Sequence, residues 1–152
     1  MVDVVGRFTE VEGSITYDSN DLTRLSVDVT INSASYSSNN IGGEDAVKSA
    51  AFLDVANFPE MTFTSTRVVS NGESLTMTGN LTIHGVTKEL SFPFNFLKPF
   101  KDPTRANTIA ANASFTINRQ DYGITFSRKL PNGKEFIGNE VYIELNVLAI
   151  EQ

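Results

Sequence analysis

LTMTGNLTIHGVTKELSFPFNF, residues 75–96, is the stretch that decides the fold. Apolar residues alternate with threonine and asparagine up to His84-Gly85, and a second alternating run then ends in Phe92, Phe94 and Phe96. Because successive side chains on a strand point to opposite faces, this pattern predicts a tight β-hairpin with one apolar wall. An apolar wall of this kind either fills a packed core or lines a cavity for an apolar ligand. The alternation alone leaves both open.

The same period of two continues along the chain, most clearly in residues 23–32. It predicts further strands at residues 2–9, 11–17, 23–32, 60–69, 108–118 and 135–150, and a turn with a short strand in 119–126. Pro99 and Pro103 predict a loop between two of these strands.

One segment breaks the alternation. Residues 44–51 are rich in alanine and begin with Glu44-Asp45, which favours a short helix, because acidic residues suit the first turn. A further turn near 53–57 ends before Pro59, so a helical segment is expected near 44–57. About eight antiparallel strands fit a barrel or a sandwich. Gly6 and Gly13 fall inside strand patterns, where bends help a sheet to curl, and they favour the barrel.

Composition narrows the classes of function. The chain has 152 residues with 40% hydrophobic content, which predicts a single globular domain over residues 1–152. Its net charge of −6 argues against a nucleic-acid partner, which requires a basic surface. The absence of cysteine excludes disulfides and thiolate metal sites. No apolar run is long enough for a membrane-spanning helix, and no signal peptide is visible.

Catalytic and metal-binding motifs are weak. His84 is the single histidine, and a histidine in a turn is more often structural than catalytic. The sequence contains no phosphate loop, no dinucleotide fingerprint and no nucleophile elbow. Arg119 and Asp121 flank Gln120, a spacing that favours an ion pair holding a turn. We therefore expect neither a catalytic site nor a metal site.

Phenylalanine is abundant, with 11 residues. In a small barrel such residues either plug the interior or line a pocket for a long apolar molecule. The residues expected to line this interior are Phe52, Phe63, Met77, Leu81, Leu90, Phe92, Phe94, Phe115, Ile117, Val141, Ile143 and Leu145.

Several short motifs carry a family resemblance. In chain order they are Gly6-Arg7-Phe8-Thr9 with Gly13-Ser14-Ile15, Ser49 with Phe52-Leu53-Asp54-Val55 and Phe58-Pro59, Phe63-Thr64-Ser65, the run TGNLTIHGVTK at 78–88, Asn118-Arg119 with Asp121-Tyr122-Gly123, and Gly138-Asn139-Glu140-Val141. The run at 78–88 is the most specific. Together these motifs resemble the YceI-like family of lipocalin-like, polyisoprenoid-binding bacterial proteins, over nearly the whole chain.

The resemblance implies an eight-stranded, antiparallel lipocalin-like β-barrel around a long isoprenoid or quinone-like tail. It also implies a periplasmic or secreted protein and, for some members, a homodimer. Two departures stand out. The family has an Arg-Asp pair where this sequence has Glu44-Asp45, and its additional first strand has no counterpart before Val2. Because an unpaired sheet edge is normally protected, we expect a gap between residues 2–9 and the final strand, or a second chain that covers it.

The leading hypothesis is a non-enzymatic protein that binds, transports or sequesters a long apolar lipid inside the barrel. An alternative is an enzyme acting on a lipid-like substrate, which would need His84 and an acid to face the cavity. His84 shares its strand parity with Thr82 on the polar wall, so we expect its side chain outside. A further alternative is a structural or partner-binding β-module with a filled core.

Overall fold

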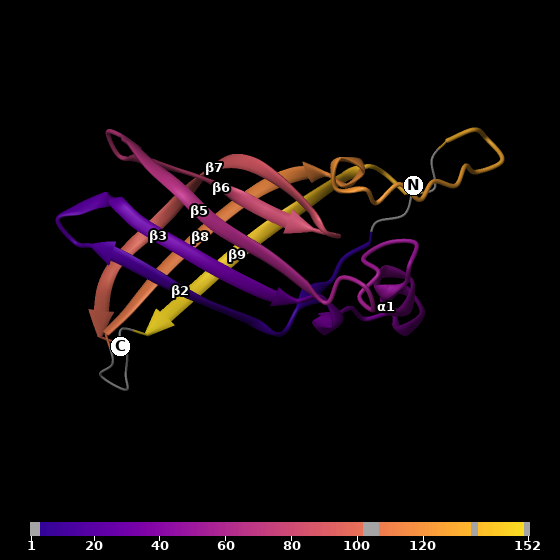
Figure 1. Ribbon diagram of the computed structural model, residues 1–152, viewed down its shortest axis with the longest axis horizontal. Coiled ribbons are helices and arrows are strands. Elements are labelled where there is room, and N and C mark those ends of the chain that lie inside the picture. Colours follow the sequence, from indigo (N-terminus) through magenta and orange to yellow (C-terminus); the bar gives the residue numbers. More distant parts are fainter. Residues whose placement is uncertain (1–3, 102–106, 135–136, 151–152) are drawn as a thin grey trace.

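The computed structural model of the chain describes residues 4–101, 107–134 and 137–150 (Figure 1). One antiparallel sheet dominates it, with neighbouring strands in the order β2-β3-β5-β6-β7-β8-β9. These strands are β2 (Val11–Asp18), β3 (Asp21–Asn32), β5 (Glu60–Asn71), β6 (Ser74–Ile83), β7 (Val86–Lys101), β8 (Asn107–Asn118) and β9 (Glu140–Ile150). A small second sheet pairs β1 (Arg7–Phe8) with β4 (Tyr36–Ser37). The helical elements are η1 (Ser33–Ser35), α1 (Ile41–Lys48) and η2 (Arg119–Tyr122).

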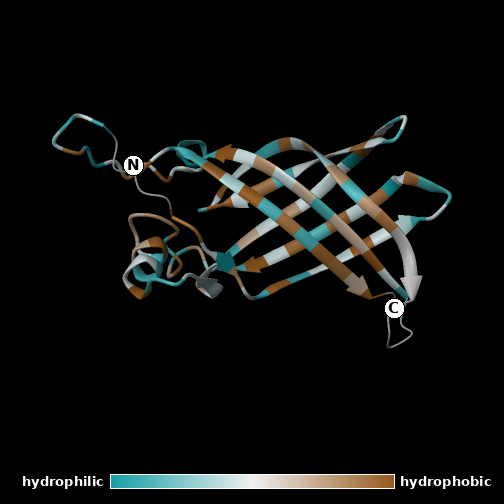
Figure 2. Ribbon diagram, turned by 180° about the vertical axis from the view of Figure 1, so that it is seen from behind, coloured by the Kyte–Doolittle hydropathy of each residue, from teal (hydrophilic) through white to brown (hydrophobic). Residues whose placement is uncertain are grey.

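The predicted central hairpin is confirmed as β6 and β7. Met77 pairs with Phe92 and Ile83 pairs with Val86, so the turn consists of His84 and Gly85 alone. Both turn residues have positive φ, 55° for His84 and 73° for Gly85, as a two-residue type I′ hairpin turn requires. The alternation of polar and apolar residues along the strands is visible in Figure 2.

The pairing of β5 with β6 is irregular near the middle of β5. The register between β5 and β6 shifts between Ser65 and Arg67, close to Gly79 of β6. A Cβ atom on Gly79 would lie 2.5 Å from Cζ of Phe63, so the Phe63 ring occupies the space that a side chain there would need. A bulge beside a glycine increases the local twist and bends the sheet. The predicted barrel-like curvature is observed (Figure 1), and the bulge beside Gly79 is one irregularity that helps the sheet to bend.

The curled sheet is open. Within the described ranges no strand pairing joins β2 to β9, so the seven strands form a half-barrel with two free edges (Figure 1). The expected gap is confirmed. Its edge strand is β2 rather than residues 2–9, because Arg7 and Phe8 pair with β4 instead. Whether a second chain covers the gap stays a prediction.

The predicted helix is displaced. α1 begins at Ile41, three residues before the predicted start at 44, because the Asn40 side chain accepts a hydrogen bond from the Gly43 backbone nitrogen at 3.1 Å and caps it. α1 ends at Lys48. The predicted second helical turn is absent, because residues 49–53 and 55–57 form bends and turns on either side of Asp54.

Three further boundaries differ from the prediction. β7 continues through Pro99 to Lys101, and its pairing with β8 shifts register between Leu97 and Phe100, which accommodates a residue that cannot donate a ladder hydrogen bond. The rest of the predicted loop, residues 102–106, lies outside the described residues. β9 begins at Glu140 rather than at 135, and residues 135–136 are also outside them. The segment 119–126, predicted as a turn that leads into a short strand, begins with η2 and forms no strand.

Candidate functional site

The concave face of the half-barrel gathers most of the predicted lining. One buried cluster contains Met77, Phe92 and Phe94, with Phe63, Leu90 and Phe115 packed against it. A second contains Leu81, with Phe52 and Ile117 packed against it. The apolar side chains of β6 and β7 lie on the same face of the sheet because apolar and polar residues alternate along both strands.

The three predicted residues of β9 lie apart from both clusters. Val141 pairs with Ile117, Ile143 with Phe115 and Leu145 with Ala113, so they continue the concave face to its free edge. Val141 keeps 39% of its surface exposed, because no strand of the described residues lies beyond β9. The concave face is therefore packed in its centre and open along the β9 edge.

Aromatic rings cross the interior. Phe63 lies 5.6 Å from Phe92 between ring centroids, and Phe92 stacks on Phe115 at 4.7 Å with a 20° interplanar angle. We call Phe63, Phe92 and Phe115 the aromatic row. Tyr17 of β2 reaches across to Phe96 of β7 at 5.5 Å, a contact that the sequence did not predict. The alternation in residues 11–17 contained the signal, because it placed Tyr17 on the same face as Ile15.

The second cluster lies at the end of the half-barrel where α1 and η2 are found, which we call the helix end (Figure 1). Tyr122 and Ile124 are buried there against the concave face. Phe52 meets Phe126 at 5.1 Å beside them. Tyr122 and Ile124 were missed by the sequence reasoning, because they follow a strand through a turn and carry no periodic pattern. Their only signal was the motif match around Asp121-Tyr122-Gly123.

Two grooves on the structure lie elsewhere. One, of about 340 Å³, runs over β6 to β9 and is lined largely by polar residues such as Asn95, Asn112 and Glu144. The other, of about 350 Å³, lies over residues 110–112 and 146–148. Of the predicted lining only Phe94 borders either groove. Neither groove is the predicted binding space, and the role of the lining residues stays a prediction.

His84 has a packing contact that the sequence did not predict. Its ring lies 4.5 Å from the ring of Phe58, and a Cβ atom on Gly123 would lie 3.5 Å from its Nδ1. No hydrogen bond to a carboxylate is present for His84 among the described residues. The ring thus holds the β6–β7 turn against the segments that contain Phe58 and Gly123, which is a structural role.

The predicted ion pair between Arg119 and Asp121 is wrong. The Arg119 Nε donates to the Gly138 carbonyl at 3.0 Å, and its Nη1 donates to the Ile124 carbonyl at 2.8 Å. The guanidinium therefore ties η2 to two backbone segments, and the side chain of Asp121 takes no part in these bonds.

Burial and hydrogen bonding change the acidity of a few groups. Burial raises the pKa of Tyr122, and the nearby charge of Asp121 raises it further. Burial also raises the pKa of Tyr36, with the Glu44 charge acting in the same direction. The Thr23 hydroxyl and backbone N–H both donate to the Asp21 carboxylate and lower its pKa.

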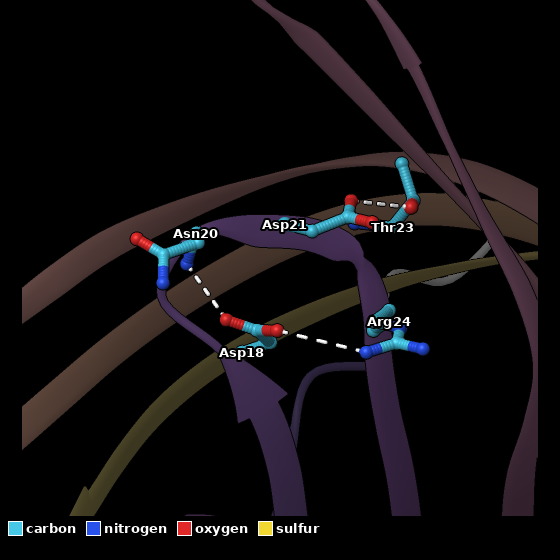
Figure 3. Close-up of polar contacts among 5 residues, drawn as sticks. All are labelled: Asp18, Asn20, Asp21, Thr23 and Arg24. Carbon is cyan, nitrogen blue, oxygen red and sulfur yellow. Dashed lines mark hydrogen bonds and ion pairs between the residues drawn. The ribbon is translucent and has the colours of Figure 1, made fainter.

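Asp18 and Asp21 are acidic residues at the two ends of the β2–β3 turn (Figure 3). The Asp18 carboxylate accepts a hydrogen bond from the Asn20 backbone nitrogen at 2.9 Å and forms a salt bridge with Arg24 at 3.8 Å. These contacts stabilise a tight turn at the end of the half-barrel opposite α1 (Figure 1). Among the described residues no cluster of three or more His, Cys, Asp or Glu side chains could hold a metal ion, and no helix could span a membrane.

Comparisons with known proteins agree with the motifs quoted above. Residues 1–149 match the model of the YceI-like domain. A UPF0312 protein of Enterobacter sp. (strain 638) is 38% identical over 120 residues, which are 79% of this chain and 62% of that protein. Protein YceI of Salmonella arizonae is 37% identical over 120 residues, 79% of this chain and 63% of that protein. The chain thus covers less than two thirds of the length of these relatives.

Solved structures share the architecture. The YceI protein of Campylobacter jejuni superimposes with a TM-score of 0.82 at 23% identity, covering 100% of this chain and 87% of that one. BcnA of Burkholderia cenocepacia gives a TM-score of 0.80 at 21% identity, covering 95% of this chain and 86% of that one. At this level of identity the similarity establishes the fold.

Proposed function

The chain belongs to the YceI-like domain family, and we propose that it binds a long apolar lipid, of the polyisoprenoid or isoprenoid-quinone type, on the concave face of its half-barrel. The protein acts as a binder or carrier without catalysis, and it has no cofactor other than this lipid. By family resemblance we also propose that it works in the periplasm or outside the cell.

The observation that carries this proposal is the uncovered apolar wall of β9. Val141 and Val147 face the interior side and remain 39% and 36% exposed, next to the packed residues of β8. A lipid chain laid against this wall would bury apolar surface that the described chain leaves in water. Each buried methylene is worth about 0.8 kcal/mol, so a long tail binds well without a charged partner.

The aromatic row supports a second candidate, a partner-binding β-module with a filled core. Phe92 touches Phe63 on one side and Phe115 on the other, so the centre of the concave face is already packed by side chains. In that case the β9 wall would meet a protein partner rather than a lipid. Enzymatic action has no such support, because the His84 ring packs against Phe58.

Two neighbouring residues of β8 allow a matched test. Ala113 is on the concave face, between Phe94 and Leu145 in register, whereas Ser114 is on the opposite face. In Ala113→Trp the indole occupies interior space that the lipid needs. In Ser114→Trp the same indole is added outside.

The measurement is titration of delipidated protein with a polyprenol and with a long-chain quinone, after circular dichroism has shown both variants folded. We expect binding by the wild type and by Ser114→Trp, and a loss of roughly tenfold or more for Ala113→Trp. Equal binding by all three proteins would mean that the lipid does not bind on the concave face. Binding by none would favour the filled-core module.

A further inference from the structure

The face of the sheet opposite the aromatic row contains the groove of about 340 Å³ over β6 to β9, which we call the amide groove. Three exposed asparagines from adjacent strands line it, Asn95 of β7, Asn112 of β8 and Asn146 of β9. They are neighbours in register, because Asn95 pairs with Asn112 and Asn112 pairs with Asn146. Since neighbouring strands are about 4.8 Å apart, the three amides form a row across the sheet.

The protein uses little of the hydrogen-bonding capacity of this row. The Asn95 Nδ2 donates to the Asn112 Oδ1 at 2.8 Å, which links two of the amides. Within the described ranges, the side chains of Asn146 and Glu144, which also line the groove, have neither a hydrogen bond nor an ion pair. An amide has both donors and an acceptor. The row therefore suits a ligand whose groups donate and accept as well, as hydroxyl groups do.

Tyr142 adds an aromatic ring to the amide groove. It precedes Glu144 on β9 by two residues, so both side chains lie on the same face, and Tyr142 keeps 67% of its surface exposed. The face of an aromatic ring is negative and attracts C–H groups. A sugar ring has apolar C–H faces and a rim of hydroxyl groups, so it can contact the Tyr142 ring and the amides together.

The charges of the amide groove argue against other classes of ligand. Its charged residues are Glu73 and Glu144, and no Lys or Arg of the described residues lines it. Two carboxylates repel a phosphate or carboxylate ligand, which would find no cation to pair with. An extended peptide adds to the edge of a sheet, whereas these side chains lie on its face. A neutral compound with many hydroxyl groups fits best.

The second groove, of about 350 Å³, continues the first. Asn112 and Asn146 line both of them. On β9 the combined track runs from Tyr142 to Leu148, a distance of about 20 Å along an extended strand. Such a track is longer than a single sugar ring and has room for a short oligosaccharide.

We propose that the amide groove binds a neutral oligosaccharide. The Tyr142 ring stacks on one sugar, and the row of amides together with the Glu144 carboxylate binds hydroxyl groups of this sugar and its neighbours. The site lies on the other side of the sheet from the concave face, so this inference does not depend on the proposed lipid-binding function.

The first experiment titrates ¹⁵N-labelled wild-type protein with cellotetraose, maltotetraose and chitotetraose. We expect the side-chain amide resonances of Asn95, Asn112 and Asn146 to shift with at least one of these sugars, with a Kd on the order of 0.1–10 mM. Tetragalacturonate, an oligosaccharide with carboxylates, should not shift them. Absence of these shifts with all three neutral sugars would overturn the inference, and so would equal binding of tetragalacturonate.

The second experiment assigns the binding to the groove with variants of exposed residues, each shown to be folded by circular dichroism. Tyr142→Ala should weaken binding roughly fivefold to tenfold, whereas Tyr142→Phe keeps the ring and should bind within about twofold of the wild type. Asn146→Ala should weaken binding roughly fivefold through the lost hydrogen bonds. Asn80→Ala removes an exposed amide of β6 outside both grooves and is the control, so its affinity should not change.

Wild-type affinity in both Tyr142→Ala and Asn146→Ala would overturn the inference, because the sugar would then bind elsewhere. A loss of equal size in Asn80→Ala and Asn146→Ala would overturn it as well, since the row of amides would have no special part in binding.

Discussion

At the scale of single residues, Gly79 is a position that has no room for a side chain. A Cβ atom there would lie 2.5 Å from the Phe63 ring and 2.6 Å from the Thr64 carbonyl oxygen. Gly79→Ala must therefore displace both the aromatic row and the bulged part of β5. We expect it to lower the free energy of unfolding by about 1–3 kcal/mol, measured by urea denaturation.

Gly42→Ala is the control for that substitution. Gly42 lies in α1, and an added Cβ would meet only the Asn40 side chain at the ordinary distance of 3.5 Å. Alanine is the better helix former, so the control should be neutral or slightly stabilising. If Gly79→Ala is as stable as the wild type, the position of the Phe63 ring does not depend on the absence of a side chain at residue 79.

Tyr122 gives a prediction for alkaline pH. Its pKa in the folded protein is raised above the usual 10.0 by burial, so between these two values the folded state binds more protons than the unfolded state. The stability that the raised pKa of Tyr122 contributes is complete below pH 10 and should be lost as the pH rises from there through the raised pKa. Urea denaturation between pH 8 and 11 should show this decline, and Tyr122→Phe should make it less steep. A decline of equal steepness in both proteins would contradict the assignment.

Arg119 and Ile124 show what sequence could not give at this scale. A charged residue in a turn is normally expected at the surface, and the two carbonyls that hold the Arg119 guanidinium belong to residues 5 and 19 positions away. Its burial depends on how these segments meet in space. The short spacing to Asp121 suggested a local ion pair and was misleading.

At the scale of elements, strands were predictable because their alternation has to match one buried face. The turn of the central hairpin was predicted correctly, since His84-Gly85 leaves two residues for it, whereas the extension of β7 to Lys101 was not. The start of α1 was not, because it depends on one hydrogen bond from the Gly43 backbone to the Asn40 side chain within a polar segment. The curl of the sheet was expected, but the bulge beside Gly79 could be found only from the register of β5 against β6.

The capping bond of α1 can be tested directly. Asn40→Ala leaves the Gly43 N–H without its acceptor, and such a change costs about 1 kcal/mol of helix stability. Because α1 has eight residues, among them Gly42 and Gly43, we expect local loss of helix before global unfolding. Backbone chemical shifts of residues 41–48 report it. Asn39→Ala is the control, and an equal loss of helix in both variants would argue against the cap.

At the scale of the whole molecule, the free edges of the half-barrel predict self-association. β9 offers unpaired backbone groups next to exposed apolar side chains, among which Leu148 is 75% exposed. Unprotected strand edges readily pair with another chain, and a homodimer remains our proposal for this one. Sedimentation velocity should show association that increases with concentration.

Leu148→Lys should weaken that association, because a charge on an edge strand opposes pairing. Asn80→Lys adds the same charge to an exposed position of β6 that is paired with β5 on one side and β7 on the other, and it should leave association unchanged. Monomers at every concentration of the wild type would refute the prediction.

The central claim, that the concave face holds an apolar lipid, has one direct measurement. Native mass spectrometry of the wild-type protein, purified without detergent from bacterial cells, should show a species heavier than the bare chain. Organic extraction should release that excess mass as a single class of long-chain lipid, and Ala113→Trp should lack it while Ser114→Trp keeps it. A folded wild-type protein with the mass of the bare chain alone, which also takes up no added lipid, would contradict the claim.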